Sequence, residues 1–278
     1  MTVSPVSTPD SRDGSSEPEA VQYQPNAAQP NAAQPSAAAW AAQALRARRA
    51  ARLPSWPRQA YLVLCKDLAI ELKSGEVTVP SAFFALLVVV LSSMAFLGGR
   101  ATEKGLAAGV IWLSVAFAAV LSLGRSWARE RESSALDGLL GTPLSASALF
   151  VGKALGLWAF CLAIELVVFP VTWLFFSIDP GRYLVGMALV ALLTTPGIAA
   201  AGTLFGALTV RTRARDLVLS VVLFPLLAPV LLVAVSATRE LLGGAAWTEL
   251  GGHARLLAVF ALAFWSAGIA LFGTLIDD

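Results

Sequence analysis

The chain has few charged residues, one histidine and two cysteines, and each shortage excludes a class of protein. Charged residues make up 14% of the 278 residues, whereas soluble domains carry about 25%. A single histidine, His253, excludes a metal centre built from several histidines. Cys65 and Cys161 belong to no CxxC or CxxCH pattern, so the sequence indicates no disulfide framework, zinc site or covalent haem site.

Motifs for catalysis and for nucleic-acid binding are also missing. No GxxxxGK[ST] motif occurs, so the chain cannot cradle nucleotide phosphates in a P-loop. One histidine does not complete a Ser/His/Asp or Cys/His arrangement. The net charge is +2 and the basic residues are spread over several loops, which does not favour nucleic acid as a partner. We therefore expect a chain that is not itself an enzyme.

Apolar residues, in contrast, are abundant and lie in six long runs. They form 57% of the chain, and each run is near the roughly 20 residues that a helix needs to cross the hydrocarbon core of a bilayer. Backbone groups in lipid must be satisfied within their own segment, so the runs should be helices. The sequence predicts an all-α, polytopic membrane protein. The predicted spans are residues 80–98, 107–124, 152–177, 183–209, 217–236 and 256–275.

Lysine and arginine residues collect in alternate gaps between these spans. The richer set of gaps holds Arg46, Arg48, Arg49, Arg52, Arg58, Lys66, Lys73, Arg125, Arg129, Arg131, Lys153, Arg211, Arg213 and Arg215. The poorer set holds Arg100, Lys104, Arg182, Arg239 and Arg255. Because basic loops stay on the cytoplasmic side, we expect both termini to be cytoplasmic.

Residues 1–57 differ in composition from the six-helix domain expected at 58–278. They are rich in Ser, Pro, Ala and Gln and repeat a five-residue Gln-Pro unit from Gln24 to Ala38. Such a segment buries too little apolar surface to offset its ordering entropy, so we predict a disordered tail. Within it, residues 40–52 either form a basic helix at the membrane surface or merely anchor the topology. No apolar core occurs in residues 1–30, so we expect no secretory signal peptide.

Residues 59–73 have the pattern of an amphipathic helix that lies in the headgroup region. Their apolar residues recur at three- and four-residue steps, with charged residues elsewhere on the wheel. The segment is too short and too charged to span, which favours an interfacial position. The apolar stripe consists of Tyr61, Leu64, Cys65, Leu68 and Leu72.

The longest gap on the basic side, from Arg125 to about Ser147, is the first candidate functional site. A charged helix should leave the membrane there, followed by a short helix with Ser133 or Ser134 as its N-cap. Its leucines would share one face, which suits either docking of a partner protein or contact with the bilayer surface. The candidate docking residues are Arg125, Glu132, Leu136, Asp137, Leu139, Leu140 and Pro143.

Glu165 lies near the middle of the third predicted span, where an ionisable residue costs roughly 2.5–3.5 kcal/mol on insertion scales. Trp158, Glu165 and Thr172 are spaced by nearly two helical turns, so they share a stripe that should face protein or a cavity. Two interpretations stay open. The stripe belongs to a substrate or proton path, or the carboxyl is neutral and hydrogen-bonded to a neighbouring helix.

Residues that interrupt helices or let them pack closely together cluster in the fourth and fifth predicted spans. Thr194-Thr195-Pro196-Gly197 should interrupt the fourth span, and Gly202 and Gly206 should permit close helix approach. Pro196 should kink the fourth span, and Pro225 and Pro229 should kink the fifth. Kinked helices suit a protein that changes conformation, although proline is also ordinary in membrane helices.

From about Arg58 onward, a series of short motifs occurs in a characteristic order. They are Gly109–Trp112, Arg125, Leu136–Pro143, Gly152, Lys153, Trp158, Leu192–Pro196, Ala207–Val210, Ser220, Pro225 and Pro229. In this order the motifs resemble the heme exporter protein B (CcmB) family, the permease of the ABC transporter in cytochrome c maturation. Glu165 falls where the family is typically apolar, so the resemblance implies no role for it.

The resemblance implies six helices of the ABC-2 exporter type, a homodimeric core in the bacterial inner membrane, and a separate ATPase subunit that binds ATP and docks on residues 125–146. It also implies a haem-handling membrane protein as a partner. Haem is a possible substrate, although the chain has no axial-ligand pair, and ATP-coupled release of a haem-loaded chaperone is equally compatible. The alternatives are an ABC-2 permease for a lipid, polysaccharide or drug, and a membrane scaffold without transport activity.

Overall fold

The computed structural model describes residues 54–95, 100–132, 144–209 and 215–277. At the helix ends 100–104, 130–132, 208–209, 215–220 and 276–277, only the backbone is described. The predicted tail at 1–57 lies almost wholly outside the described residues, as does the basic segment at 40–52.

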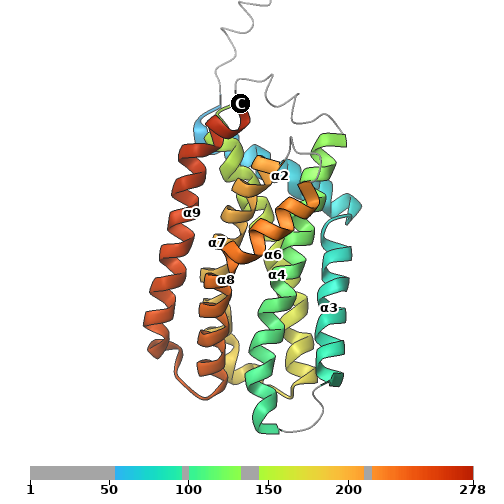
Figure 1. The fold of residues 1–278 in the computed structure, drawn as a ribbon, viewed down its shortest axis with the longest axis vertical. Coiled ribbons are helices and arrows are strands. Elements are labelled where there is room, and N and C mark those ends of the chain that lie inside the picture. The colour runs from blue at the N-terminus through green and yellow to red at the C-terminus, as the bar shows by residue number, and fades with distance from the viewer. Residues whose placement is uncertain (1–53, 96–99, 133–143, 210–214, 278) are drawn as a thin grey trace, which may run out of the picture. The chain divides into compact units, whose positions relative to one another are not determined.

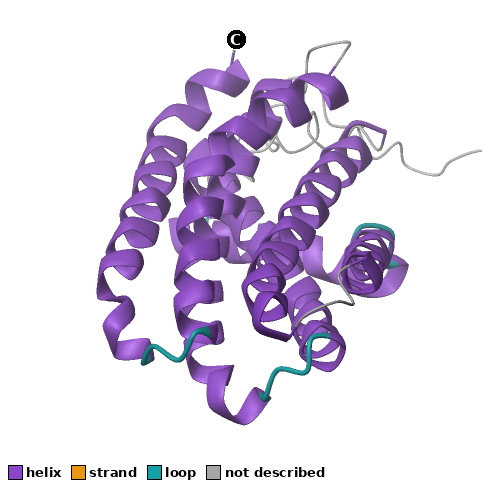
Figure 2. Cartoon of the chain, turned by 60° about the horizontal axis from the view of Figure 1, so that its bottom comes forward, coloured by secondary structure: helices purple, strands orange, loops and turns teal. Residues whose placement is uncertain are grey.

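Six of the described helices are long and apolar enough to cross a membrane. They are α3 (Thr78–Ala95), α4 (Arg100–Glu132), α6 (Ala146–Phe175), α7 (Pro180–Thr209), α8 (Arg215–Leu242) and α9 (Gly251–Asp277) (Figure 1). A shorter helix, α2 (Trp56–Ser74), comes before them, and the 3-10 turn η1 (Trp247–Leu250) leads into α9. The described residues contain helices and connecting loops with no strand (Figure 2). The predicted all-α class and the six spans are confirmed.

Several helices extend beyond the predicted spans, because an apolar run marks only the part of a helix that suits lipid. The helix α4 continues to Glu132, which confirms the charged extension beyond its span. The helix α6 begins at Ala146 instead of residue 152. Ser145 caps it, since its hydroxyl accepts a hydrogen bond from the backbone N–H of Ala148 at 3.4 Å.

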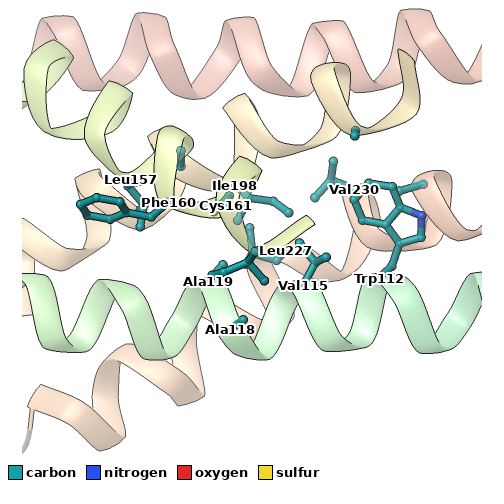
Figure 3. Close-up of a cluster of buried hydrophobic side chains, with 14 of the residues drawn as sticks. Trp112, Val115, Ala118, Ala119, Leu157, Phe160, Cys161, Ile198, Leu227 and Val230 are labelled. Atoms are coloured by element: carbon teal, nitrogen blue, oxygen red, sulfur yellow. The ribbon is translucent and has the colours of Figure 1, made fainter. Parts of the chain in front are cut away.

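The helix α6 lies at the centre of the packing, in contact with α2, α3, α4, α7 and α9. The helix α2 lies across the end of the bundle at which α9 finishes, whereas the loops that join α6 to α7 and α8 to α9 lie at the opposite end (Figure 1). Side chains from α4, α6, α7 and α8 meet in the core, including Trp112, Phe160, Ile198 and Leu227 (Figure 3).

Proline does not interrupt α7, so the predicted break at residues 194–197 is wrong. Pro196 lies inside a helix that is continuous from Pro180 to Thr209. The hydroxyls of Thr194 and Thr195 donate to carbonyls one turn earlier, at 2.7 and 2.8 Å. The indole of Trp265 on α9 donates to the Pro196 carbonyl at 3.1 Å. These bonds lie next to a residue that lacks an N–H, and a proline inside a helix is tolerated in membrane proteins.

Three further prolines lie beyond the first turn of described helices. Pro225 and Pro229 are in α8, whose ribbon changes direction part-way along its length (Figure 1). Pro170 lies inside α6, although the sequence analysis did not single it out.

The predicted close-approach pair, Gly202 and Gly206, makes room for side chains of neighbouring helices. A Cβ atom on Gly202 would lie 3.3 Å from Leu123 of α4 and from Leu157 of α6. A Cβ atom on Gly206 would collide with the indole of Trp127. Large side chains therefore fill the space that these glycines leave.

Gly152 allows α2 to pack closely on α6. A Cβ atom at this position would lie 2.6 Å from the Cβ of Val63 and 2.7 Å from the backbone oxygen of Ala60. Both contacts involve atoms near the backbone of α2, so a side chain at residue 152 would displace the whole helix. In contrast, a Cβ atom on Gly109 would meet nothing within 4 Å.

We expect the substitution Gly152→Ala to destabilise the protein by roughly 1–3 kcal/mol, the usual cost of overpacking. Thermal unfolding of the purified protein in detergent measures this as a lower Tm. Gly109→Ala is the matched control and should leave the Tm unchanged or slightly raised. Equal Tm values for the two variants would contradict the tight contact between α2 and α6.

Candidate functional site

The helix α2 confirms the predicted amphipathic helix, but it turns part of its polar face into the protein. Its buried residues include Gln59 and Glu71, and the side chain of Asp67 is only 12% exposed. Tyr61 and Leu72, from the predicted apolar stripe, are 61% and 88% exposed. The other three stripe residues, Leu64, Cys65 and Leu68, are only partly exposed, and Leu68 packs against the core. An interfacial position of α2 stays a prediction.

Glu71 joins α2 to the first turn of α3 and to the end of α4. One carboxylate oxygen accepts from the backbone N–H groups of Val77 at 3.0 Å and Thr78 at 2.6 Å. The other lies 3.2 Å from the guanidinium of Arg129, which also pairs with Glu76 at 3.0 Å. The carboxylate therefore caps α3 and neutralises part of the charge of Arg129.

Asp67 joins α2 to α6 through a buried ion pair. The ammonium of Lys153, whose side chain is 5% exposed, lies 3.2 Å from the Asp67 carboxylate. The same ammonium lies 5.4 Å from the ring centroid of Trp127 on α4. Lys66 also contacts Asp67, at 3.2 Å. One lysine thus contacts both α2 and α4 from its place on α6.

Gln59 and Trp56 hold the start of α6. The Gln59 side-chain carbonyl accepts from the backbone N–H of Ser145 at 3.0 Å and from its hydroxyl at 3.2 Å. The indole of Trp56 donates to the hydroxyl of Ser147 at 2.9 Å. The first turn of α6 is therefore fixed against the N-terminal half of α2.

We call these contacts the α2 junction. It consists of Gln59, Asp67 and Glu71 on α2 with Arg129, Ser145 and Lys153 on α4 and α6. The chain leaves the junction after Arg129 and returns to it at Ser145. These two attachment points lie about 18 Å apart along α2, at 1.5 Å per residue.

The segment between those two points contains most of the candidate docking residues. Leu136, Asp137, Leu139, Leu140 and Pro143 lie outside the described residues, and only the backbone of Glu132 is described. Arg125 is exposed on α4. Docking on this segment therefore stays a prediction, and the described structure adds the residues that hold its two ends.

Sequence reasoning missed the α2 junction, although a signal was present. Gln59, Val63, Asp67 and Glu71 recur every four residues, so they lie on one face of a helix. A helix face that is fully exposed to solvent would not be expected to carry Val63 between Gln59 and the carboxylates of Asp67 and Glu71. The partners of this face lie far away in sequence and could not be inferred from spacing.

The three intramembrane candidates have different surroundings in the described part of the chain. Trp158 donates to the hydroxyl of Thr195 at 3.1 Å, and Thr172 donates to the carbonyl of Val168 at 2.8 Å. Glu165 is 3% exposed, and neither of its oxygens has a hydrogen-bond partner in the described part of the chain. Of the three, only Glu165 lines the cavity between α6 and α7. A path through all three stays a prediction.

The family model described as CcmB protein matches residues 58–274, which begin within α2 and end within α9. The chain belongs to the CcmB family. The match includes the α2 junction and all six spans. The family is the membrane permease subunit of an ABC transporter, so this chain is a multi-pass membrane subunit and not the catalytic one.

Relatives of the chain are named heme exporter protein B. The protein of Paracoccus denitrificans is 30% identical over 211 residues, which cover 75% of this chain and 96% of the relative. That of Bradyrhizobium diazoefficiens is 30% identical over 182 residues, or 64% of this chain and 80% of the relative. That of Pseudomonas aeruginosa is 27% identical over 172 residues, or 62% and 76%. The family membership implied by the sequence motifs is confirmed.

Removal of the Glu71 carboxylate should destabilise the α2 junction. We expect Glu71→Ala to lower the stability by roughly 1–3 kcal/mol, because two N–H groups and one guanidinium lose a charged acceptor. The measurement is the Tm of the purified protein in detergent. Glu76→Ala is the control: this side chain is 69% exposed, so its loss should change the Tm much less. A larger effect at Glu76 would refute the capping role of Glu71.

Proposed function

We propose that the chain is the permease subunit of an ATP-driven transporter for cytochrome c biogenesis, and that its ATPase subunit docks on residues 125–146. Membership of the CcmB family and the names of the relatives support the transport role. The transporter would either export haem or use ATP to release a haem-loaded chaperone. A haem-handling membrane protein and a second copy of the chain are the proposed membrane partners.

The α2 junction is the observation that carries the docking proposal. Near the start of residues 125–146, Arg129 binds Glu71, and near their end Ser145 binds Gln59. A subunit that pulls on the segment would therefore pull on α2 at two points. Because α2 is joined to α3 and α4 by Glu71 and to α6 by Asp67, that displacement would pass to three membrane helices together.

The proposed orientation places α2, the docking segment and both termini on the cytoplasmic side of the bacterial inner membrane. The excess of lysine and arginine in the gaps on that side supports it. The loop between α8 and α9, at the opposite end of the bundle, would then face the periplasm (Figure 1).

Cysteine labelling tests the orientation. In a Cys65→Ser, Cys161→Ala background, Ser133→Cys should react with a membrane-impermeant maleimide only after the membrane is opened. The control is Thr248→Cys, an exposed position in η1, which should react in intact spheroplasts. Reaction of residue 133 from outside would refute the orientation and, with it, docking of a cytoplasmic ATPase.

The docking proposal predicts that a double substitution, Leu139→Glu with Leu140→Glu, uncouples the ATPase. In proteoliposomes that contain both subunits, ATP turnover should fall to the rate of the ATPase subunit alone, because two charges replace apolar contacts. Ala246→Glu, at an exposed position in the loop before η1, is the control and should leave turnover unchanged. Unchanged turnover in the double variant would favour a scaffold that does not transport.

Haem staining of c-type cytochromes tests the wider function. A strain that lacks the gene should accumulate none, and the wild-type gene should restore them. The Leu139→Glu, Leu140→Glu gene should fail to restore them while its product is still present in the membrane. Normal cytochromes in the deletion strain would instead favour export of an unrelated substrate.

A further inference from the structure

A groove of about 540 Å³ lies between α4 and α8, beside the end of α3. We call it the α4–α8 groove. Leu106, Gly109 and Leu113 line it from α4, and Phe224 and Leu232 are among the residues that line it from α8. Leu113 and Leu232 are 48% and 68% exposed, so the groove opens towards the surroundings of the membrane helices.

Residues of α4 and α8 themselves create the space in this groove. A Cβ atom on Gly109 would meet no described atom within 4 Å, whereas side chains of neighbouring helices fill the space beside Gly202 and Gly206. Pro225 and Pro229 lie within the part of α8 that lines the groove. Proline bends a helix, so α8 cannot pack evenly along α4 in this region.

The length of the groove matches one leaflet of a bilayer. Along α8 its lining runs from Phe224 to Val235, which is about 16 Å at 1.5 Å per residue. The hydrocarbon core of a bilayer is about 30 Å thick, so one leaflet contributes about 15 Å. Val235 lies near the end of the candidate membrane span at Leu242. An acyl chain along the groove would therefore begin near a bilayer surface and end near the midplane.

Arg239 lies at the end of the groove that is nearer to this surface. It follows Val235 by one turn of α8, and two of its guanidinium nitrogens lie 3.8 Å from the position of a Cβ atom on Gly105. Gly105 comes one turn before Gly109 on α4. The guanidinium therefore lies across the end of the groove, from α8 to α4. Arg239 is exposed, and no hydrogen bond or ion pair links it to another described residue.

Positive charge exceeds negative charge at this end of the two helices, which lies opposite α2 (Figure 1). Residues 100–104 of α4 include two basic residues and one acidic residue, which adds a net charge of +1 to that of Arg239. The neighbouring carboxylate, Glu240, lies 3.6 Å from Nδ1 of His253 on α9. A complementary ligand is therefore negative at this end and apolar along the groove.

We propose that the α4–α8 groove binds a phospholipid with an anionic headgroup. The phosphate accepts hydrogen bonds from the guanidinium of Arg239, which can donate two in parallel. One acyl chain lies along the apolar lining, where contact with water is avoided. Arginine suits this level of the bilayer, because its stem lies on apolar surface while its charged end reaches the headgroups. This site is separate from the α2 junction and does not depend on the proposed role in cytochrome c biogenesis.

Native mass spectrometry of the full-length chain tests the proposal. The chain is released from nanodiscs that contain equal amounts of phosphatidylglycerol and phosphatidylcholine, and the retained lipids are counted. The wild-type chain should retain phosphatidylglycerol in roughly tenfold excess, because only this headgroup neutralises the guanidinium. Arg239→Gln should remove most of the excess. Arg255→Gln is the matched control: the same change at an exposed residue of α9, outside the groove, should leave the excess unchanged.

A second variant tests the groove without changing the charge. Gly109→Leu places a side chain in the groove without a collision at its Cβ atom. It should lower the retention of both lipids and abolish the excess of phosphatidylglycerol, while the Tm stays unchanged or rises.

Glycerophosphoglycerol, the soluble headgroup without acyl chains, should not displace the retained phosphatidylglycerol. Displacement by this compound, equal retention of the two lipids by the wild-type chain, or equal excess in the Arg239→Gln and Arg255→Gln variants would overturn the proposal. So would disulfide-linked dimers of a Leu232→Cys variant that retains no lipid, because a second copy of the chain would then cover the groove.

Discussion

The absence of hydrogen-bonding partners in lipid is the constraint on which the structure depends. It makes every described span a helix, and it directs buried hydroxyls such as those of Ser114 and Thr194 to carbonyls one turn earlier. It also requires an acceptor for a buried indole N–H, and the acceptor can lie on another helix. The indole of Trp112 on α4, for example, donates to the hydroxyl of Thr238 on α8 at 2.8 Å.

The same constraint explains how much of the fold could be predicted from sequence. An apolar run of the right length has only one solution in lipid, so six spans could be predicted from composition alone. The ends of the helices could not be predicted in this way. The helix α4, for example, continues to Glu132 through charged residues, and an apolar run does not show how far such an extension reaches. The sequence also could not show that α7 continues as a helix through Pro196. Beside this residue, a threonine hydroxyl and an indole from α9 donate hydrogen bonds to backbone carbonyls.

The candidate site was harder to predict than the fold because its contacts join residues that are distant in sequence. The spacing of residues in α2 identified an amphipathic helix, but not which polar residues face the protein. Asp67 pairs with a lysine 86 positions later, and Gln59 binds Ser145 at the same separation. Only the packing of α2 on α6, which Gly152 permits, brings these pairs together. Family likeness predicted a docking segment but did not show which residues hold its ends.

Glu71 also sets an order of events during synthesis of the chain. Its contacts with Val77 and Thr78 involve neighbours that leave the ribosome almost together with it. Its third partner, Arg129, is made 58 residues later, after α3 and nearly all of α4. The nascent hairpin of α3 and α4 therefore lacks the Glu71–Arg129 ion pair until nearly all of α4 has been made. A ribosome stalled before codon 129 would leave α2 bound to α3 but not to α4.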